Sequence, residues 1–266
     1  MVTDVHLPNW LDKCIFIDLK ANYCCSNSDM TVIDWDKKDV LNYLGTYFPR
    51  SYAESYCIFS NYFRLYLGNW VNRESLSIFD FGCGTGGEIV GMLMAISECL
   101  PNINKVDIIA LDGNQDALRL FEQVMGVVAS KVDIVVKWQV APIRIDDLYD
   151  LSLLNSIITG DFDIIMSFKA ICEFVTKERF EEENAYKSIA QSFLPKLKVG
   201  NIMLLVDIST YNNVSQEWLP RMMDQGLREA NCHVVLKNKG YNQIFTVSHS
   251  KRMRDISKVA WRIILK

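Results

Sequence analysis

The sequence lacks the features that define several common classes of protein. No apolar run approaches the ~20 residues that a membrane-spanning helix requires. Internal repeats and low-complexity linkers are also missing. The opening residues, MVTDVHLPNWLDK, contain two acids and no basic region before the first apolar residues. We therefore expect neither a signal peptide nor a membrane-spanning segment.

Potential metal ligands are few as well. The chain has three histidines and eight cysteines, and no two cysteines have the C-x-x-C spacing of a zinc or redox motif. Scattered thiols of this kind are typical of small buried side chains in a reducing compartment. We therefore expect a cytoplasmic protein with free cysteines and no metal site.

The composition is that of a chain with a full hydrophobic core, because 50% of the residues are hydrophobic and 23% are charged. The net charge of −4 is unevenly distributed: residues 237–266 carry +7, which leaves −11 for the rest. A basic end on an acidic body is compatible with an anionic partner. It is equally typical of an exposed strand edge protected by lysine and arginine, which is the interpretation we favour.

The first ~70 residues are expected to be mostly helical and to form a cap or lid, residues 1–70. One helix should start between Asp34 and Lys38 and end near Tyr47, because Pro49 follows. Ser51 would then cap a second helix that runs to Trp70 and carries an aromatic face. Such a face usually packs into a core.

Apolar runs alternate with helical patterns in the remainder of the chain, residues 71–266. Strands are expected over 77–81, 106–111, 132–140, 162–168 and 202–208, and helices over 88–100, 115–130, about 177–194 and 216–230. Strands that are apolar on both faces indicate a parallel sheet with helices on each side, hence an α/β fold. Three strand-like segments follow, over 233–237, 243–249 and 259–265, and the pattern does not determine which two form the final hairpin.

The segment SIFDFGCGTGGEIVGML, residues 77–93, combines a strand, a glycine-rich turn and a helix start. It matches two fingerprints. The glycines at 82, 84 and 87 spell the G-x-G-x-x-G of dinucleotide sites. The same turn, read with Asp80, spells the D-x-G-x-G-x-G of S-adenosylmethionine (SAM) sites. Both need glycine because the backbone passes close to the ligand.

Asp80 distinguishes the two. A carboxylate beside the turn would repel the pyrophosphate of a dinucleotide, whereas it stabilises the ammonium and sulfonium of SAM. Asp112, in IIALDGNQ at the end of the next strand, suits the ribose hydroxyls of either ligand. The charge of Asp80 therefore favours SAM.

Here the chain resembles the class I (Rossmann-like) SAM-dependent methyltransferases. FDFGCGTGG resembles their first motif, ALDGN the second and FDIIMSFKAICEF the fourth, and LPKLKVGNIMLLVDIS is similar to a later segment. The resemblance covers roughly residues 76–208. It implies a seven-stranded, mostly parallel sheet with an antiparallel last strand, and SAM as cofactor.

The resemblance also implies site residues. Those assigned to the methionine end of SAM are Asp80, Gly82, Cys83, Gly84 and Gly86. The ribose would be bound by Asp112 with Gly113 beside it, and the adenine by Asp146 or Asp147. Ser167, Phe168 and Lys169 would border the transferred methyl group.

Methyl transfer is an in-line displacement that relies on positioning, so a general base is optional. Lys169 and Glu173, four residues apart, are either an acid–base pair or an ordinary surface pair. Arg50 and Tyr52 are candidates for contacting SAM or the substrate from the lid. The [DN]-P-P-[YFW] motif of amino-methylating nucleic-acid enzymes is missing, because Ser167-Phe168-Lys169-Ala170 stands in its place.

Three functions remain open at this point. The first is a methyltransferase for a small molecule, which the acidic body favours. The second is an RNA- or protein-directed methyltransferase, supported only by the basic C-terminal end. The third is a non-catalytic SAM-fold module that binds a partner, against which the intact glycine motif argues.

Overall fold

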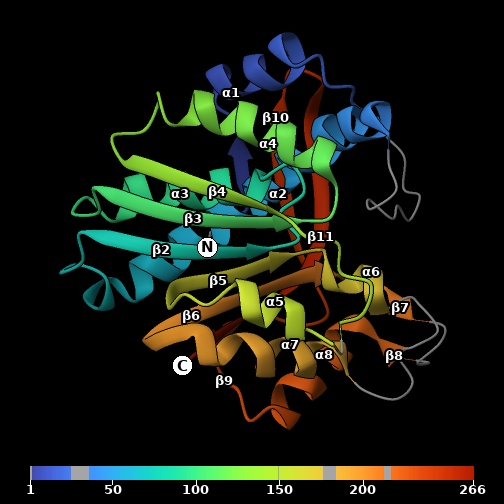
Figure 1. Ribbon diagram of the computed structural model, residues 1–266. Coiled ribbons are helices and arrows are strands. Elements are labelled where there is room, and N and C mark those ends of the chain that lie inside the picture. Colours follow the sequence, from blue (N-terminus) through green and yellow to red (C-terminus); the bar gives the residue numbers. More distant parts are fainter. Residues whose placement is uncertain (1, 25–35, 149, 176–183, 213–216) are drawn as a thin grey trace. The chain divides into compact units, whose positions relative to one another are not determined.

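The computed structural model describes residues 2–24, 36–148, 150–175, 184–212 and 217–266 (Figure 1). The chain folds into two compact units. Unit 1 comprises Met1–Ser75, Cys83–Pro142 and Ile244–Ser257; unit 2 comprises Leu76–Gly82, Ile143–Gln243 and Lys258–Lys266. The domain boundary expected near residue 70 stays a prediction.

The described part of unit 1 contains three short helical segments, three longer helices and two pairs of parallel strands. Its elements are β1 (Asp4–His6), α1 (Asn9–Lys13), the π-helix Cys14–Asp18, α2 (Lys37–Leu65), the 3-10 helix Leu67–Asn69, α3 (Gly87–Cys99), β3 (Lys105–Asp112), α4 (Gln115–Val128), β4 (Val135–Pro142) and β10 (Gln243–His249). β1 pairs in parallel with β10, and β3 pairs in parallel with β4. Among its described residues, the N-terminal segment is therefore mostly helical, with the short strand β1 near its start.

Helix α2 corrects the expectation of two helices, because it continues through Pro49 to Leu65. It starts at Asp36, whose side chain accepts the backbone N–H of Lys38 and Asp39. Proline inside a helix removes a hydrogen bond and costs ~3 kcal/mol. Packing against α3 offsets that cost. The backbone of α2 at Phe48 and Tyr52 lies so close to Gly87 and Gly91 that a side chain on either glycine would collide with it.

Unit 2 contains the remaining strands and the C-terminal helices. Its elements are β2 (Ser75–Phe81), α5 (Ser152–Ile157), β5 (Phe162–Phe168), α6 (Ile171–Val175), α7 (Ala185–Phe193), the 3-10 helix Leu194–Lys196, β6 (Leu197–Ile208), β7 (Tyr211–Asn212), β8 (Glu217–Trp218), α8 (Leu219–Glu229), β9 (His233–Lys237) and most of β11 (Arg252–Leu265). β5 pairs in parallel with β2 and with β6, as Figure 1 shows for β5 and β6. β11 is antiparallel to β6 and to β9.

The α/β fold with mostly parallel strand pairing and an antiparallel last strand is thus confirmed. β5 is buried at every position, which explains its uninterrupted apolar sequence. The terminal strands resolve the open question, since β10 leads through a turn at 250–251 into β11. The helix expected over about 177–194 lies partly outside the described residues, which show α7. In the described chain, no helix has the length and hydropathy to cross a membrane.

Candidate functional site

The glycine-rich turn between β2 and α3 has the backbone that its sequence requires. Gly82, Gly84 and Gly86 have φ values of 76°, 48° and 82°, in the left-handed region that favours glycine. The N–H of Gly86 donates to the carbonyl oxygen of Cys83, which closes the turn. Helix α3 begins directly after it, at Gly87. Three glycines thus form a compact cradle at a helix N-terminus.

In unit 1, Asp112 fixes this cradle. Its carboxylate accepts the N–H of Gly84 at 2.7 Å and the N–H of Asn114 at 2.8 Å, while the N–H of Cys83 donates to Leu111. Burial raises the pKa of Asp112, although the hydrogen bonds from Asn114 and Gly84 lower it. The structure therefore brings together two predicted site residues, Gly84 and Asp112.

A tyrosine that the sequence analysis missed borders the same turn. A Cβ on Gly84 would lie 3.1 Å from both Cε1 and the hydroxyl oxygen of Tyr43, in α2. Around Gly86, by contrast, the space of a side chain is filled by the ring of Phe121 from α4. Tyr43 belongs to no recognisable sequence motif, and it lies next to Gly84 only in the folded chain.

Unit 2 holds the other part of the predicted site. Asp80 is fully buried near the end of β2 and pairs in the strand register with Met166, next to Ser167. Gly82 has no room for a side chain because the methyl group of Ala170 lies there. Ser167 and Phe168, at the end of β5, are buried too.

Lys169 follows β5 in an unusual conformation. Its φ of 56° lies in the left-handed region, where a residue with a side chain is strained, and its N–H donates to the carbonyl oxygen of Val206 in β6. Strain of this kind is concentrated at functional sites. Because α6 begins only at Ile171, Lys169 and Glu173 do not share one helix. Whether they act in the chemistry stays a prediction.

A buried polar network lies on the next strand, β6, in unit 2. The carboxylate of Asp207 accepts a hydrogen bond from the hydroxyl of Tyr186 at 2.9 Å and one from the N–H of Ile208 at 3.0 Å. Burial raises the pKa of Asp207 to about 6, although hydrogen bonds from Cys172 and Tyr186 lower it. Burial also raises the pKa of Cys172, so that its thiol is protonated at neutral pH. This network connects β6 to α6 and α7, next to the segment that contains Lys169.

The two lid candidates lie in α2. Arg50 forms an ion pair with Asp255, with its Nη2 and Nε at 2.8 and 2.9 Å from the same carboxylate oxygen. Tyr52 is 3% exposed and stacks on Tyr56 with the ring centroids 6.1 Å apart. Arg50 is thus held by a buried carboxylate, and Tyr52 packs at the face of α2 that contacts α3. Their assignment to the cofactor or the reaction stays a prediction.

Two other predictions fall on the surface. Asp146 is exposed and forms an ion pair with Arg144 at 2.9 Å. In the basic C-terminal segment, Arg262 is instead buried and pairs with Asp224. The other seven basic residues are exposed: Lys237, Lys239, Lys251, Arg252, Arg254, Lys258 and Lys266. The adenine contact and the anionic partner stay predictions.

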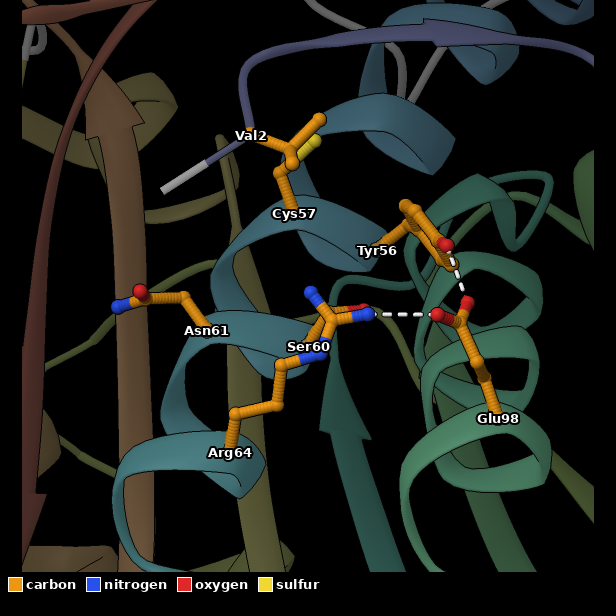
Figure 2. A pocket seen from close by; sticks show the side chains of 7 residues that line it. All are labelled: Val2, Tyr56, Cys57, Ser60, Asn61, Arg64 and Glu98. Carbon is orange, nitrogen blue, oxygen red and sulfur yellow. Dashed lines mark hydrogen bonds and ion pairs between the residues drawn. The ribbon is translucent and has the colours of Figure 1, made fainter.

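A cavity of about 380 Å³ lies in unit 1 between α2 and α3. Figure 2 shows Tyr56 and Arg64 of α2 directed at Glu98 of α3, whose carboxylate accepts hydrogen bonds from both. Cys57 and Ser60 also line it. None of the predicted cofactor residues lines it.

Comparison with known proteins gives the fold. No protein-family model and no curated protein sequence matches the chain. Magnesium protoporphyrin IX methyltransferase from Synechocystis PCC 6803, solved with SAM bound, superimposes with a TM-score of 0.50 at 10% identity, covering 96% of this chain and 89% of that one. Precorrin-6y C5,15-methyltransferase from Geobacter metallireducens GS-15 gives a TM-score of 0.48 at 14% identity, covering 80% and 89%. The first comparison shows that the chain has the Rossmann-like fold of class I SAM-dependent methyltransferases.

Proposed function

We propose that this protein is a SAM-dependent methyltransferase that acts on a small-molecule acceptor. The observation that carries the proposal is the glycine cradle before α3, in which Gly84 donates its N–H to Asp112 at the end of β3. This arrangement leaves a carboxylate at the position where ribose hydroxyls bind in such folds. The Synechocystis protein, which shares the fold, was solved with SAM bound.

The side chains around the cradle suit SAM better than a dinucleotide. Asp80 and Glu88 are both buried and flank the turn with negative charge, and no lysine or arginine lies between them in sequence. That charge suits the ammonium and sulfonium of SAM and disfavours pyrophosphate. The hydroxyls of Thr85 and Ser167 are buried and have no hydrogen-bond partner among the described residues, so each is able to bind a polar ligand group.

The chain's own residues would position the reactants. When bound, SAM supplies a methyl group on a positively charged sulfur; the carbon–sulfur bond breaks as the bond to the acceptor atom forms, and S-adenosylhomocysteine remains. Asp112 would hold the ribose, and Ser167 and Phe168 would border the methyl group. Lys169 and Glu173 are candidates to accept the proton that the acceptor loses. Asp146 is assigned to the adenine of the cofactor, and Arg50 to SAM or the substrate.

Binding measurements test the cofactor. Calorimetry on the full chain should show binding of SAM and S-adenosylhomocysteine, and no binding of NAD⁺ at the same concentrations. Tighter binding of NAD⁺ than of S-adenosylhomocysteine would overturn the methyltransferase proposal.

Transfer from SAM with a labelled methyl group then tests the acceptor class. Cell extract is divided into a small-molecule and a macromolecular fraction, and each is incubated with the protein. We expect the label in small molecules, as the acidic body of the chain indicates. Label confined to RNA or protein would refute the acceptor class, and cofactor binding without any transfer would indicate a non-catalytic module.

A further inference from the structure

Tyr43 lies where the proposed cofactor would pass over the glycine cradle. The absent side chain of Gly84 would point at the hydroxyl edge of Tyr43, with Cε1 and the oxygen each 3.1 Å from its Cβ. Gly84 has a positive φ and donates its N–H to Asp112. The tyrosine is half-buried.

The chemistry of this neighbour differs from that at Gly86. There the atoms beside the turn are ring carbons of Phe121, which can only pack. A phenol hydroxyl both donates and accepts hydrogen bonds, so it is able to bind a carboxylate or an amine. The amino-acid end of SAM carries both groups.

A column of side chains on α2 holds Tyr43 in place. Its ring stacks on that of Tyr47, with centroids 5.1 Å apart and an interplanar angle of 27°. The guanidinium of Arg50 lies 5.5 Å from the centroid of the Tyr47 ring, on its face. Arg50 is in turn fixed by Asp255, whose side chain is 2% exposed. The column therefore ends on a buried carboxylate that has little freedom to move.

We propose that Tyr43 is a cofactor-specificity residue whose hydroxyl binds the amino-acid end common to SAM and S-adenosylhomocysteine. Tyr47, Arg50 and Asp255 are positioning residues that hold the ring over Gly84. Arg50 would therefore act on the cofactor through Tyr43, and not by contacting SAM itself. This inference rests on the proposed function, because it places SAM over the glycine cradle.

Two ligands that differ only at the amino-acid end test the contact. S-adenosylhomocysteine carries that end, and 5′-methylthioadenosine keeps the adenosine and sulfur without it. Calorimetry measures both on the wild type, on Tyr43→Phe and on the control Tyr56→Phe, a tyrosine of α2 whose hydroxyl donates to Glu98 away from the turn. We expect Tyr43→Phe to bind S-adenosylhomocysteine about three- to tenfold more weakly, the loss of one hydrogen bond, with unchanged affinity for 5′-methylthioadenosine. Tyr56→Phe should bind both as the wild type does.

The outcomes separate the two proposals. A wild type that binds neither SAM nor S-adenosylhomocysteine refutes the proposed function itself. A wild type that binds, with Tyr43→Phe equally tight, refutes only the role of Tyr43. Tighter binding by Tyr43→Ala would show that the ring obstructs the cofactor and would refute it as well. Tyr43→Phe keeps the ring, so folding is checked simply by an unchanged melting temperature.

The column is tested at its far end with Asp255→Asn. We expect weaker binding of S-adenosylhomocysteine with 5′-methylthioadenosine unaffected, because only the amino-acid contact depends on Tyr43. Glu98→Gln is the matched control, since Glu98, in α3, pairs with Arg64 near the end of α2 that is distant from Tyr43. Equal losses for both ligands in Asp255→Asn would assign Asp255 to general stability and refute its positioning role.

Discussion

The backbone carbonyl oxygen of Tyr52 occupies the place where a side chain on Gly91 would begin. Helices α2 and α3 are thereby in backbone contact, and Ser55 reinforces the contact by donating its hydroxyl to the carbonyl oxygen of Glu88 at 2.6 Å. The N-terminal helix is thus fixed to the helix that follows the glycine cradle.

Gly91→Ala should lower the free energy of unfolding by about 1–3 kcal/mol, because an added methyl group has no room between the helices. Gly126→Ala is the control: Gly126 lies in α4 with nothing within 4 Å of the added atom. That substitution should be neutral or stabilise by up to ~1 kcal/mol. Urea denaturation of both variants measures the difference, and equal stabilities would refute the close contact.

Tyr52→Phe distinguishes two roles for Tyr52. A lid residue would lose cofactor affinity with normal folding. Phenylalanine keeps the buried ring that stacks on Tyr56, so a packing role predicts unchanged affinity of Tyr52→Phe for S-adenosylhomocysteine, and a lower melting temperature for Tyr52→Ala, which removes the ring. Thermal denaturation and calorimetry on the same preparation decide between them, and an affinity loss at constant melting temperature would restore the lid role.

Asp112→Asn should weaken binding of S-adenosylhomocysteine at least tenfold and also lower stability. The carboxylate accepts N–H groups with both oxygens, and an asparagine presents an NH₂ group to one of them, so Gly84 or Asn114 loses its acceptor. Calorimetry and thermal denaturation measure the two effects. Unchanged affinity would remove Asp112 from the cofactor site.

Asp207 should make stability depend on pH. Burial raises its pKa from the ordinary value of 3.8 to about 6 in the folded chain. The folded state therefore binds the proton of Asp207 more tightly than the unfolded state does. The contribution of Asp207 to stability is fully present below about pH 4 and decreases as the pH rises to about 6. At 1.36 kcal/mol per unit, the loss is about 3 kcal/mol. Asp207→Asn should lack this component. Urea denaturation between pH 4 and pH 7 compares the two, and parallel curves would contradict the shifted pKa.

Asp224→Ala should destabilise the chain by about 2 kcal/mol or more, because it leaves the buried guanidinium of Arg262 without its carboxylate. Arg262 contacts both oxygens of Asp224, at 2.7 and 2.9 Å, and its side chain is 2% exposed. The control is Asp146→Ala, which breaks the exposed pair with Arg144 and should change stability by less than ~0.5 kcal/mol. Similar losses in both variants would refute the burial argument.

The sequence predicted those parts whose determinants are local. The run FDIIMSF gives β5 at the expected bounds, and glycines with a preceding acid give the turn before α3. The continuation of α2 through Pro49 was not predictable, because the compensating contact is with Gly91, a residue distant in sequence. Tyr43 was missed for the same reason: its neighbour Gly84 is brought to it only by the packing of α2.

Strand β1 shows the extreme of such long-range dependence. His6 and Ser248, which are 242 residues apart, interact through their side chains where β1 pairs with β10. During synthesis on the ribosome, β1 leaves the exit tunnel long before β10 and meets its partner strand only after the 242 residues that follow His6, up to Ser248, have been made. Helix α2, in contrast, finds α3 much earlier. Strand β1 should therefore dock later than α2, in a slow step set by the closure of a long chain segment rather than by local structure.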